Sequence, residues 1–474
     1  MSANDKYQQI KKTFSIYRKM IRQALAGTDQ DFTSMKLGAA IFLLSVPMVL
    51  EMIMESVFAI ADIFFVARLG ADAVAAVGLT ESMMTVVYAL AVGFSAGTTA
   101  MVSRRIGEKN PEGASRAAAQ AILAGVALSV LLAIPGLFYS YDLLRLMGAS
   151  HELAAENHGY TRIMFGGNMV IMLLFIINAA FRSAGDAALS MRVLLIANGV
   201  NILLDPLLIF GLGPIPALGI GGAAIATNIG RGLAVLFQFY ILFRGKMRIQ
   251  LSIRHFLPDF RLLAILTRLS VGGILQNIIA TASWIVLVRI VSQFGSSAVA
   301  GYTIAIRIVI FALLPSWGLS NAAATLVGQN LGAGKPERAA RAAWITGFVN
   351  MAMLGLVSVV FLAFPEPYIR LFINEPEVVE LGVSCLRIVS IGFVFYAMGM
   401  VMSQSLNGAG DTYTPTLLNF ICFWLIEIPL AWFLAIRSGY GYNGVFYAIV
   451  IAETTLTVLG MYIFSKGNWK LKKV

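Results

Sequence analysis

Long apolar stretches dominate the chain, and short polar connections separate them. Twelve of these stretches reach the length of about 20 residues that an α-helix needs to cross the hydrocarbon core of a membrane. The pattern therefore predicts an all-α polytopic membrane protein with twelve transmembrane helices. The expected spans are residues 37–66, 74–102, 116–138, 160–181, 188–212, 218–243, 264–292, 299–327, 340–364, 382–406, 413–436 and 444–465.

The sequence contains an internal duplication, in which motifs of the first half recur 225 residues later. Leu69-Gly70 returns as Phe294-Gly295, and Ala184-Gly185-Asp186 returns as Ala409-Gly410-Asp411. Each half holds six spans, so both halves enter the membrane from the same side. We expect two pseudo-symmetric six-helix bundles related by an axis along the membrane normal. The predicted parts are a basic N-terminal segment (1–36), the first bundle (37–243), a linker (244–263), the second bundle (264–465) and a tail (466–474).

Composition and charge agree with this picture. Hydrophobic residues make up 58% of the chain and charged residues 12%, against about 45–50% and about 25% in soluble domains. Of the 35 basic residues, 26 fall on one side of the predicted spans, which predicts a multi-pass protein of the plasma (inner) membrane with both termini in the cytoplasm. The net charge of +11 is spread over six segments, so we expect no nucleic-acid partner.

No nucleophile motif or metal-ligand spacing is present, so we expect no enzymatic activity. An internal duplication in an apolar chain is typical of a secondary transporter, so the only cofactor we expect is a coupling ion, Na⁺ or H⁺. The expected partners are small organic substrates and membrane lipids, and we expect a monomer.

The first span carries an acidic stripe formed by Glu51, Glu55 and Asp62. Their spacings of four and seven residues place all three on one face of a helix. Charged side chains are expensive inside a membrane and are functional candidates for that reason. The alternative is that they only hold neighbouring helices together through hydrogen bonds and ion pairs.

Oxygen-bearing side chains also recur on the fifth and sixth spans. Asn201 and Asp205 lie one helical turn apart on the fifth span, and Thr227 lies on the sixth. Together with Asp62 they offer two carboxylates, an amide and a hydroxyl, which are the hard oxygen ligands that suit a small cation such as Na⁺ or a proton. These four residues are the predicted coupling site.

Arg231 follows Thr227 by one turn and needs a counter-charge inside the membrane. Charge balance predicts that it pairs with Glu51 or Glu55 in an auxiliary charge network. Asp62 and Asp205 would then remain available for the ion.

Comparison of the two halves distinguishes residues that the fold requires from residues that serve a function. A residue that the fold itself requires should recur in both halves, yet the four predicted coupling residues do not recur. At the offset of 225, apolar residues replace them: Leu287 for Asp62, Ile426 for Asn201, Leu430 for Asp205 and Ala452 for Thr227.

Four further charged residues within the spans are candidates for a function. Glu81 and Arg307 occupy near-equivalent positions in the two halves, where they could meet across a cleft and close an outer gate, or pair locally within each half. Glu427 and Glu453 lie in the eleventh and twelfth spans. They could attract a cationic substrate to the cleft or be satisfied within the second bundle.

Several of these segments resemble the MATE (multidrug and toxic compound extrusion) family along essentially the whole chain. Pro47 is followed fifteen residues later by Asp62. The other matching segments are Ala-Ala-Phe-Arg-Ser-Ala-Gly-Asp at 179–186, Asn-Ile-Leu-Leu-Asp-Pro at 201–206 and Gly-Ala-Ala-Ile-Ala-Thr at 222–227.

The resemblance implies export of organic, often cationic, compounds in exchange for Na⁺ or H⁺. Asp62, Asn201, Asp205 and Thr227 match the cation ligands of members that bind the ion in the first half. Members with a site in the second half have a Glu in the seventh span, where this chain has Gln276-Asn277, so that site is not expected here.

The sequence thus predicts a secondary active transporter that exports cationic or amphipathic organic compounds by antiport, with alternating access between two bundles. The first alternative is a flippase for lipids or lipid-linked oligosaccharides. A membrane scaffold or embedded enzyme is a more distant one, and it would show no dependence on a cation gradient.

Overall fold

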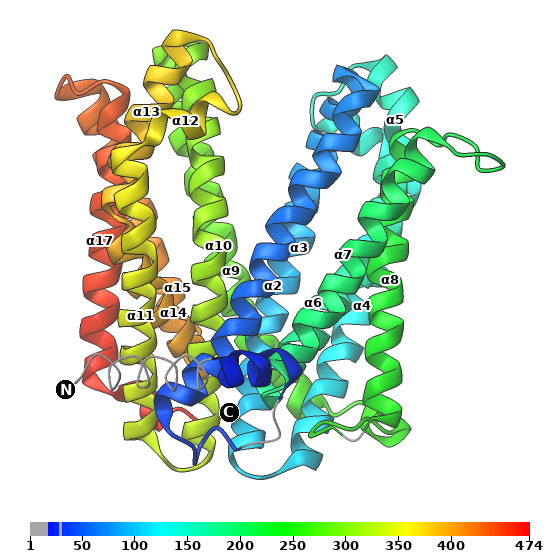
Figure 1. Cartoon of the computed structure of the whole chain (residues 1–474), viewed down its shortest axis with the longest axis vertical. Coiled ribbons are helices and arrows are strands. Elements are labelled where there is room, and N and C mark those ends of the chain that lie inside the picture. Colours follow the sequence, from blue (N-terminus) through cyan, green and yellow to red (C-terminus); the bar gives the residue numbers. More distant parts are fainter. Residues whose placement is uncertain (1–17, 28–30, 246) are drawn as a thin grey trace, which may run out of the picture.

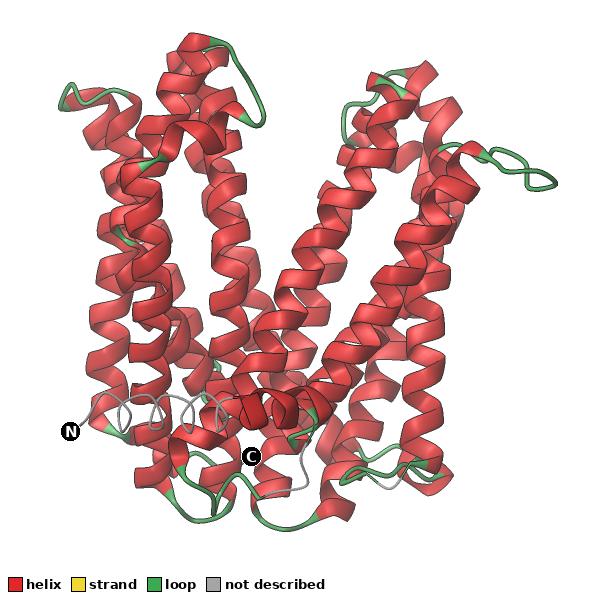
Figure 2. Ribbon diagram, viewed as in Figure 1, coloured by secondary structure: helices red, strands yellow, loops and turns green. Residues whose placement is uncertain are grey.

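The computed structural model describes residues 18–27, 31–245 and 247–474. Most of the predicted basic N-terminal segment, 1–17, lies outside the described residues, as does Lys246 of the linker. Within the described ranges the chain consists of helices and their connections, and the only extended pairing there is an isolated bridge between Leu212 and Ile215 (Figure 2).

The helices follow the two halves of the sequence. The first half contains α2 (Leu37–Val66), η1 (Ala67–Leu69), α3 (Ala71–Gly107), α4 (Pro111–Leu146), α5 (His151–Gly166), α6 (Asn168–Ala184), α7 (Ala187–Phe210) and α8 (Ile220–Arg244), and η2 (Ile253–Phe256) lies in the linker. The second half contains α9 (Phe260–Val291), η3 (Ser292–Phe294), α10 (Ser296–Gly332), α11 (Pro336–Ala363), α12 (Pro365–Arg370), α13 (Pro376–Ile391), α14 (Phe393–Gly408), α15 (Tyr413–Asn419), the π-helical segments η4 (Phe420–Glu427) and η5 (Phe433–Arg437) with α16 (Ile428–Trp432) between them, α17 (Tyr442–Lys466) and η6 (Asn468–Leu471).

The predicted fold class is confirmed. In the described part of the chain, eleven helices are long and apolar enough to cross a membrane, and α13 with α14 forms a pair bent by 55° that supplies a twelfth span. Several helices extend beyond their predicted ends. Helix α3 has 37 residues, or about 55 Å at 1.5 Å per residue, and so exceeds a hydrocarbon core of about 30 Å. Hydrophobicity delimits the part inside the membrane, whereas backbone hydrogen bonding carries the helix past it.

The duplication is visible in the backbone. Helices α3 and α10 both have 37 residues, and each is preceded by a short 3₁₀ turn and a glycine. These glycines, Gly70 and Gly295, have φ values of 106° and 100°, a region that side chains with a Cβ rarely enter. The same turn therefore joins the first two helices of each half.

The offset of 225 residues does not hold to the end of the repeat. Helices α8 and α17 both have 25 residues and start after Gly219 and Gly441, which are 222 positions apart and have φ values of 56° and 57°. The connection before them runs over 211–219 in the first half and only 438–441 in the second. In the structure Thr227 therefore corresponds to Ile449 and not to Ala452, and Arg231 corresponds to Glu453.

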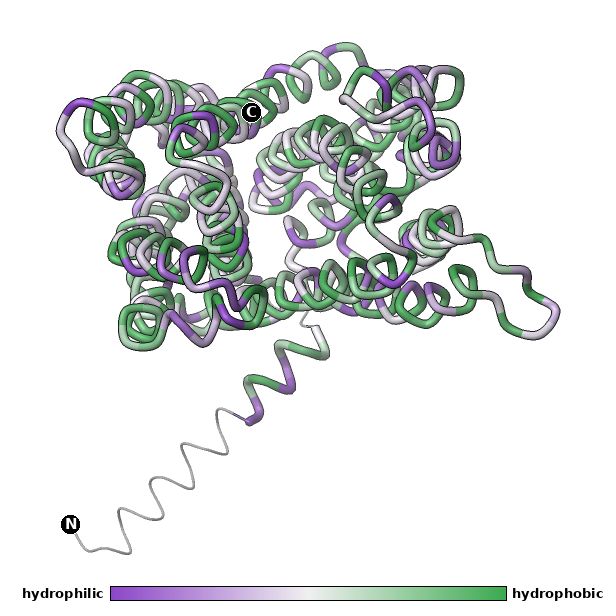
Figure 3. The backbone as a smooth tube through the Cα atoms, turned by 90° about the horizontal axis from the view of Figure 1, so that it is seen from above, coloured by the Kyte–Doolittle hydropathy of each residue, from purple (hydrophilic) through white to green (hydrophobic). Residues whose placement is uncertain are grey.

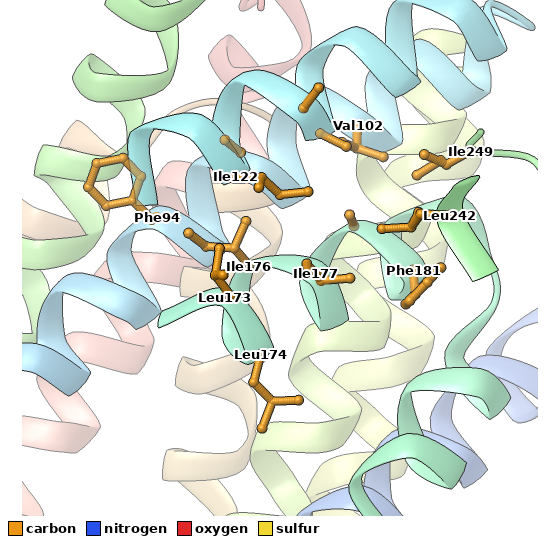
Figure 4. Close-up of a cluster of buried hydrophobic side chains, with 14 of the residues drawn as sticks. Phe94, Val102, Ile122, Leu173, Leu174, Ile176, Ile177, Phe181, Leu242 and Ile249 are labelled. Carbon is orange, nitrogen blue, oxygen red and sulfur yellow. The ribbon is translucent and has the colours of Figure 1, made fainter. Parts of the chain in front are cut away.

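The helices form two groups that converge at one end of the molecule and separate toward the other (Figure 1). Seen from above, the two groups lie side by side (Figure 3). Helices α2 to α8 make up one group and α9 to α17 the other, and the C-terminus lies at the converging end. A large apolar cluster, which includes Ile122, Ile176 and Phe181, stabilises the first group (Figure 4). A second cluster, which includes Leu287 and Phe446, lies in the other group.

Glycines bring the two groups into backbone contact at the seam. A Cβ added at Gly93 of α3 would lie 2.7 Å from the backbone nitrogen of Ile274 in α9. One added at Gly318 of α10 would lie 2.6 Å from the carbonyl oxygen of Met48 in α2. Both positions therefore require glycine because a facing helix occupies the space that a side chain would need.

Candidate cation and substrate sites

Three of the four predicted coupling residues form a hydrogen-bonded group in the first bundle. Asn201 and Asp205 of α7 are 1% and 0% exposed, and Thr227 of α8 is also buried. The Asn201 Nδ2 group donates to Asp205 Oδ1 at 3.4 Å and to Thr227 Oγ1 at 3.2 Å. The close packing of α7 against α8 brings these side chains together.

Asp62 of α2 faces the same group. It is partly buried, and its carboxyl is close enough to Asp205 for the two charges to interact. Three buried oxygens of the cluster have no hydrogen-bond partner: Asp62 Oδ1, Asn201 Oδ1 and Asp205 Oδ2. Buried polar atoms are normally satisfied, so these oxygens fit a small cation or a proton, each of which they would coordinate or share.

The cluster has no nitrogen or sulfur ligands. Among the described residues no three His, Cys, Asp or Glu side chains gather as a metal site. Two carboxylates with amide and hydroxyl oxygens favour a hard, weakly held ion over a transition metal.

Tyr160 of α5 also belongs to the cluster, although it is not among the residues predicted from the sequence. It is buried, and its hydroxyl interacts electrostatically with the carboxylates of Asp62, Asp205 and Glu81. A single tyrosine at the start of an apolar span has no distinguishing pattern, so only helix packing reveals its position.

Arg231 pairs with Glu55. The Arg231 Nη2 atom lies 3.3 Å from Glu55 Oε1, and Nη1 donates to the hydroxyl of Tyr88 at 3.2 Å. The guanidinium also lies over the ring of Phe58, 5.2 Å from its centroid. Since the charge of Arg231 also reaches Asp62, this residue connects the acidic stripe with the cation cluster.

Glu51 has a different partner, Arg182 in the last turn of α6. Arg182 Nη1 lies 2.6 Å from Glu51 Oε1, and Ser190 Oγ donates to Glu51 Oε2 at 3.0 Å. In the sequence, Arg182 belongs to the family-like segment 179–186 and to the basic residues of the predicted cytoplasmic side, and neither feature predicts this pair. The acidic stripe is therefore divided: Glu51 and Glu55 are paired with arginines, and Asp62 faces Asp205.

A cavity of about 220 Å³ lies at the seam between the two groups of helices. Glu51, Glu55 and Arg182 line it, so both ion pairs border this space. The remaining wall combines amides and aromatic rings from both halves, including Phe175, Asn178, Trp317, Asn321, Gln404 and Asn407. We refer to it as the seam cavity.

Glu81 and Arg307 lie on α3 and α10 and are both exposed. The positive charge of Arg307 reaches Glu81, but no ion pair of hydrogen-bonding length joins either residue to another described residue. In this conformation they do not form a closed gate.

Glu427 and Glu453 do not line the seam cavity. Glu427 ends the π-helical segment η4 and is 1% exposed, and Glu453 of α17 is partly buried. The structure thus brings them together inside the second bundle and away from the first-bundle cluster.

The chain matches known proteins over nearly its whole length. The model of the MatE family matches twice, at residues 47–207 and 273–433. A probable multidrug resistance protein, YoeA of Bacillus subtilis, is 27% identical over 90% of this chain and 93% of its own length. An FAD transporter of Shewanella oneidensis is 27% identical over 91% of this chain and 95% of its own length.

A solved structure supports the same relationship. It is described as the outward-facing conformation of a multidrug resistance MATE family transporter, and it has a TM-score of 0.87 with 26% sequence identity over 93% of this chain and 98% of its own. One match of the family model falls within each half of the duplicated fold. The chain therefore belongs to the MatE family, whose members are membrane transporters and not enzymes.

Proposed function

We propose that this protein exports organic compounds by antiport with Na⁺ or H⁺, and that the coupling ion binds at Asp62, Asn201, Asp205 and Thr227. The observation that carries the proposal is the set of three buried, unpartnered oxygens in the first-bundle cluster. Buried polar atoms are normally satisfied, and a bound cation or proton would satisfy these three.

The proposed orientation has both termini in the cytoplasm, as the distribution of basic residues favours. The two groups of helices converge at the C-terminal end, so the opposite, separated end would face outward. The similarity to a structure described as outward-facing supports this assignment. Glu81 and Arg307 would then lie on the outer side of the seam, where closure of the bundles would bring them together.

Arg231 supplies a physical connection between ion and substrate. Its charge reaches Asp62 on one side, and on the other it pairs with Glu55, which lines the seam cavity. When a cation neutralises Asp62, the attraction of Arg231 for Asp62 is lost and Glu55 remains its nearest counter-charge. An organic cation beside Glu55 would then be held less strongly. Ion entry from outside would therefore favour substrate release.

The substrate class we propose is amphipathic organic compounds, including cationic ones. The seam cavity combines aromatic rings and amides with two carboxylates that already have arginine partners, so it suits a molecule with apolar bulk and few charges. The relatives' names, which include multidrug resistance proteins and an FAD transporter, indicate organic substrates of varied chemistry. A flippase for lipid headgroups would be favoured by a net cationic cavity, and the paired charges here give no such excess.

The test is efflux of a cationic dye from proteoliposomes with Na⁺ and H⁺ gradients imposed separately. We expect one gradient to drive transport in the wild type and Asp62→Asn to abolish it. The matched control is Asp142→Asn, which removes an exposed carboxylate of α4 far along the chain from the cluster. Transport that neither gradient drives, in folded protein, would refute antiport. Headgroup flipping would then be the next activity to measure.

A further inference from the structure

Glu427 is a buried carboxylate that the proposed mechanism does not use. It is the last residue of the π-helical segment η4, it is 1% exposed, and its Oε2 atom has no hydrogen-bond partner. π-Helical turns carry a surplus residue relative to an α-helix and often occur at functional sites. Glu427 thus combines an unsatisfied buried oxygen with an irregular backbone.

Two buried tyrosines with unsatisfied hydroxyl groups interact electrostatically with this carboxylate. Tyr302 of α10 and Tyr396 of α14 are buried, and neither hydroxyl has a hydrogen-bond partner. The charge of Glu427 reaches both hydroxyls, and that of Glu453 reaches Tyr396. Tyr396 also lies just after Gly392, where α13 and α14 bend by 55°. Broken helices of this kind are typical of ion-binding sites in transporters.

The group contains no positive charge. Glu453 of α17 acts on Glu427 with like charge, and Ser283 of α9 lies beside it. The other titratable groups in reach are Tyr302, Tyr396 and the two buried free thiols, Cys385 and Cys422. No ion pair between described residues includes Glu427 or Glu453.

The corresponding helices α8 and α17 carry charges of opposite sign at the same position. Helices α8 and α17 correspond at an offset of 222 residues, so Glu453 occupies the position that Arg231 holds in the first bundle. There a guanidinium neutralises Glu55, whereas here a carboxylate adds to the charge of its neighbour. Two ionised carboxylates in an apolar bundle without a basic partner are strongly disfavoured.

We propose that Glu427 and Glu453 form a second proton site, in the second bundle, with the hydroxyl of Tyr396 available to donate to whichever carboxylate is ionised. The site is distinct from the seventh-span position, where Gln276 is already engaged with Asn407 and the carbonyl oxygen of Thr412 at 3.1 Å each. Its role in coupling rests on the proposed antiport, but the presence of the exchangeable proton does not.

Release of this proton to water would leave both carboxylates charged and would push α17 away from η4. The two elements pack directly on one another. The π-helical turn places an irregular backbone next to this contact, as is frequent at functional sites. The bound proton would thus favour the packing in which α17 contacts η4. Its release would favour a packing in which the two are farther apart.

The proton can be observed directly by infrared spectroscopy of the full chain in lipid vesicles. We expect a carboxylic-acid C=O band at neutral pH that is lost on raising the pH, and that is reduced in Glu427→Gln and in Glu453→Gln. The matched control is Glu375→Gln, which removes an exposed carboxylate before α13 and should leave the band unchanged. Glu427→Asp keeps a titratable group and should retain a shifted band, which guards against loss of the signal through misfolding.

Several outcomes would overturn the proposal. One is a Glu427→Gln/Glu453→Gln double variant with the wild-type carboxylic-acid band. Another is a band that does not change over the pH range in which the protein stays folded. A band abolished by Na⁺ but not by K⁺ would show a metal-ion site instead of a proton site. Because the band is read without transport, failure of the antiport proposal in the Asp62→Asn efflux assay would leave this test intact.

Discussion

Removal of Arg182 tests whether the pair with Glu51 is structural. The two side chains are 12% and 2% exposed and lie 2.6 Å apart. In Arg182→Met the Glu51 carboxylate would keep only the hydrogen bond from Ser190. Truncating one partner of a buried ion pair typically costs about 3–5 kcal/mol, because the other charge is left buried without compensation. We expect a loss of unfolding free energy near the lower end, about 3 kcal/mol, since the pair borders the seam cavity and Arg182 is 12% exposed.

The pair of Arg231 with Glu55 provides an internal comparison. Its atoms are 3.3 Å apart and Glu55 is 27% exposed, so water can solvate the carboxylate when the arginine is removed. For Arg231→Met we therefore expect a smaller loss, about 1–2 kcal/mol. The ranking of the two pairs follows from burial and distance alone, which makes it a stricter test than either value.

The measurement is a double-mutant cycle on the free energy of unfolding in mixed micelles, followed by intrinsic tryptophan fluorescence. The cycle combines wild type, Glu51→Gln, Arg182→Met and the double variant. We expect the double variant to recover most of the loss, with a coupling energy of about 2–3 kcal/mol. Strict additivity, or an Arg182→Met variant as stable as the wild type, would refute the assignment of a strong buried pair.

Three further predictions follow from the seam, the outer side and the N-terminal segment. Gly318→Ala should lower stability by about 1–3 kcal/mol, because its Cβ would meet the Met48 carbonyl. The control Gly78→Ala, which has open space around it, should leave the stability unchanged. Equal thermal stability of the two variants would contradict the seam contact. A Glu81→Cys/Arg307→Cys variant should cross-link during turnover and lose efflux until reduced, and an active protein that never cross-links would exclude closure at this point. Burial opposes ionisation of Asp31, but hydrogen bonds from Thr33 and the charges of Lys109 and Lys335 outweigh it and lower its pKa. The anchoring of this segment should therefore hold at neutral pH and weaken as the pH falls through the lowered pKa. Amide protection at 31–35, measured relative to the intrinsic exchange rate at each pH, should fall in acid in the wild type and already at neutral pH in Asp31→Asn. Equal protection in that variant would count against the anchor.

Some of the candidate site could be predicted from residue spacing. Asn201 and Asp205 are neighbours on one helix face, and the structure joins them by a hydrogen bond. The choice between Glu51 and Glu55 as partner of Arg231 could not be made in this way. All three lie at similar depth, and the rotation of α2 and α8 about their axes decides which side chains reach one another.

Other features had no sequence signal of their own. Tyr160 is one tyrosine among 15 in the chain, and its place beside Asp62 and Asp205 depends on how α5 packs against the bundle. Arg182 is at the end of a span, where basic residues ordinarily mark topology, and only the structure shows that its side chain turns inward to Glu51. The offset of 222 between α8 and α17 was hidden because a shorter connection and π-helical turns displace the register.

Fold class, span number and duplication could all be predicted from the sequence. The fold class and the spans follow from the transfer of each residue from water to hydrocarbon, which is nearly additive along the chain and needs no knowledge of neighbours. The duplication follows from motifs that recur at a fixed offset. The pairing of the charges, the oxygens without partners and the positions of the two acidic clusters are visible only in the folded structure. Such contacts depend on helix rotation, tilt and the small residues that let helices approach, and these are set by the packing of all the helices together.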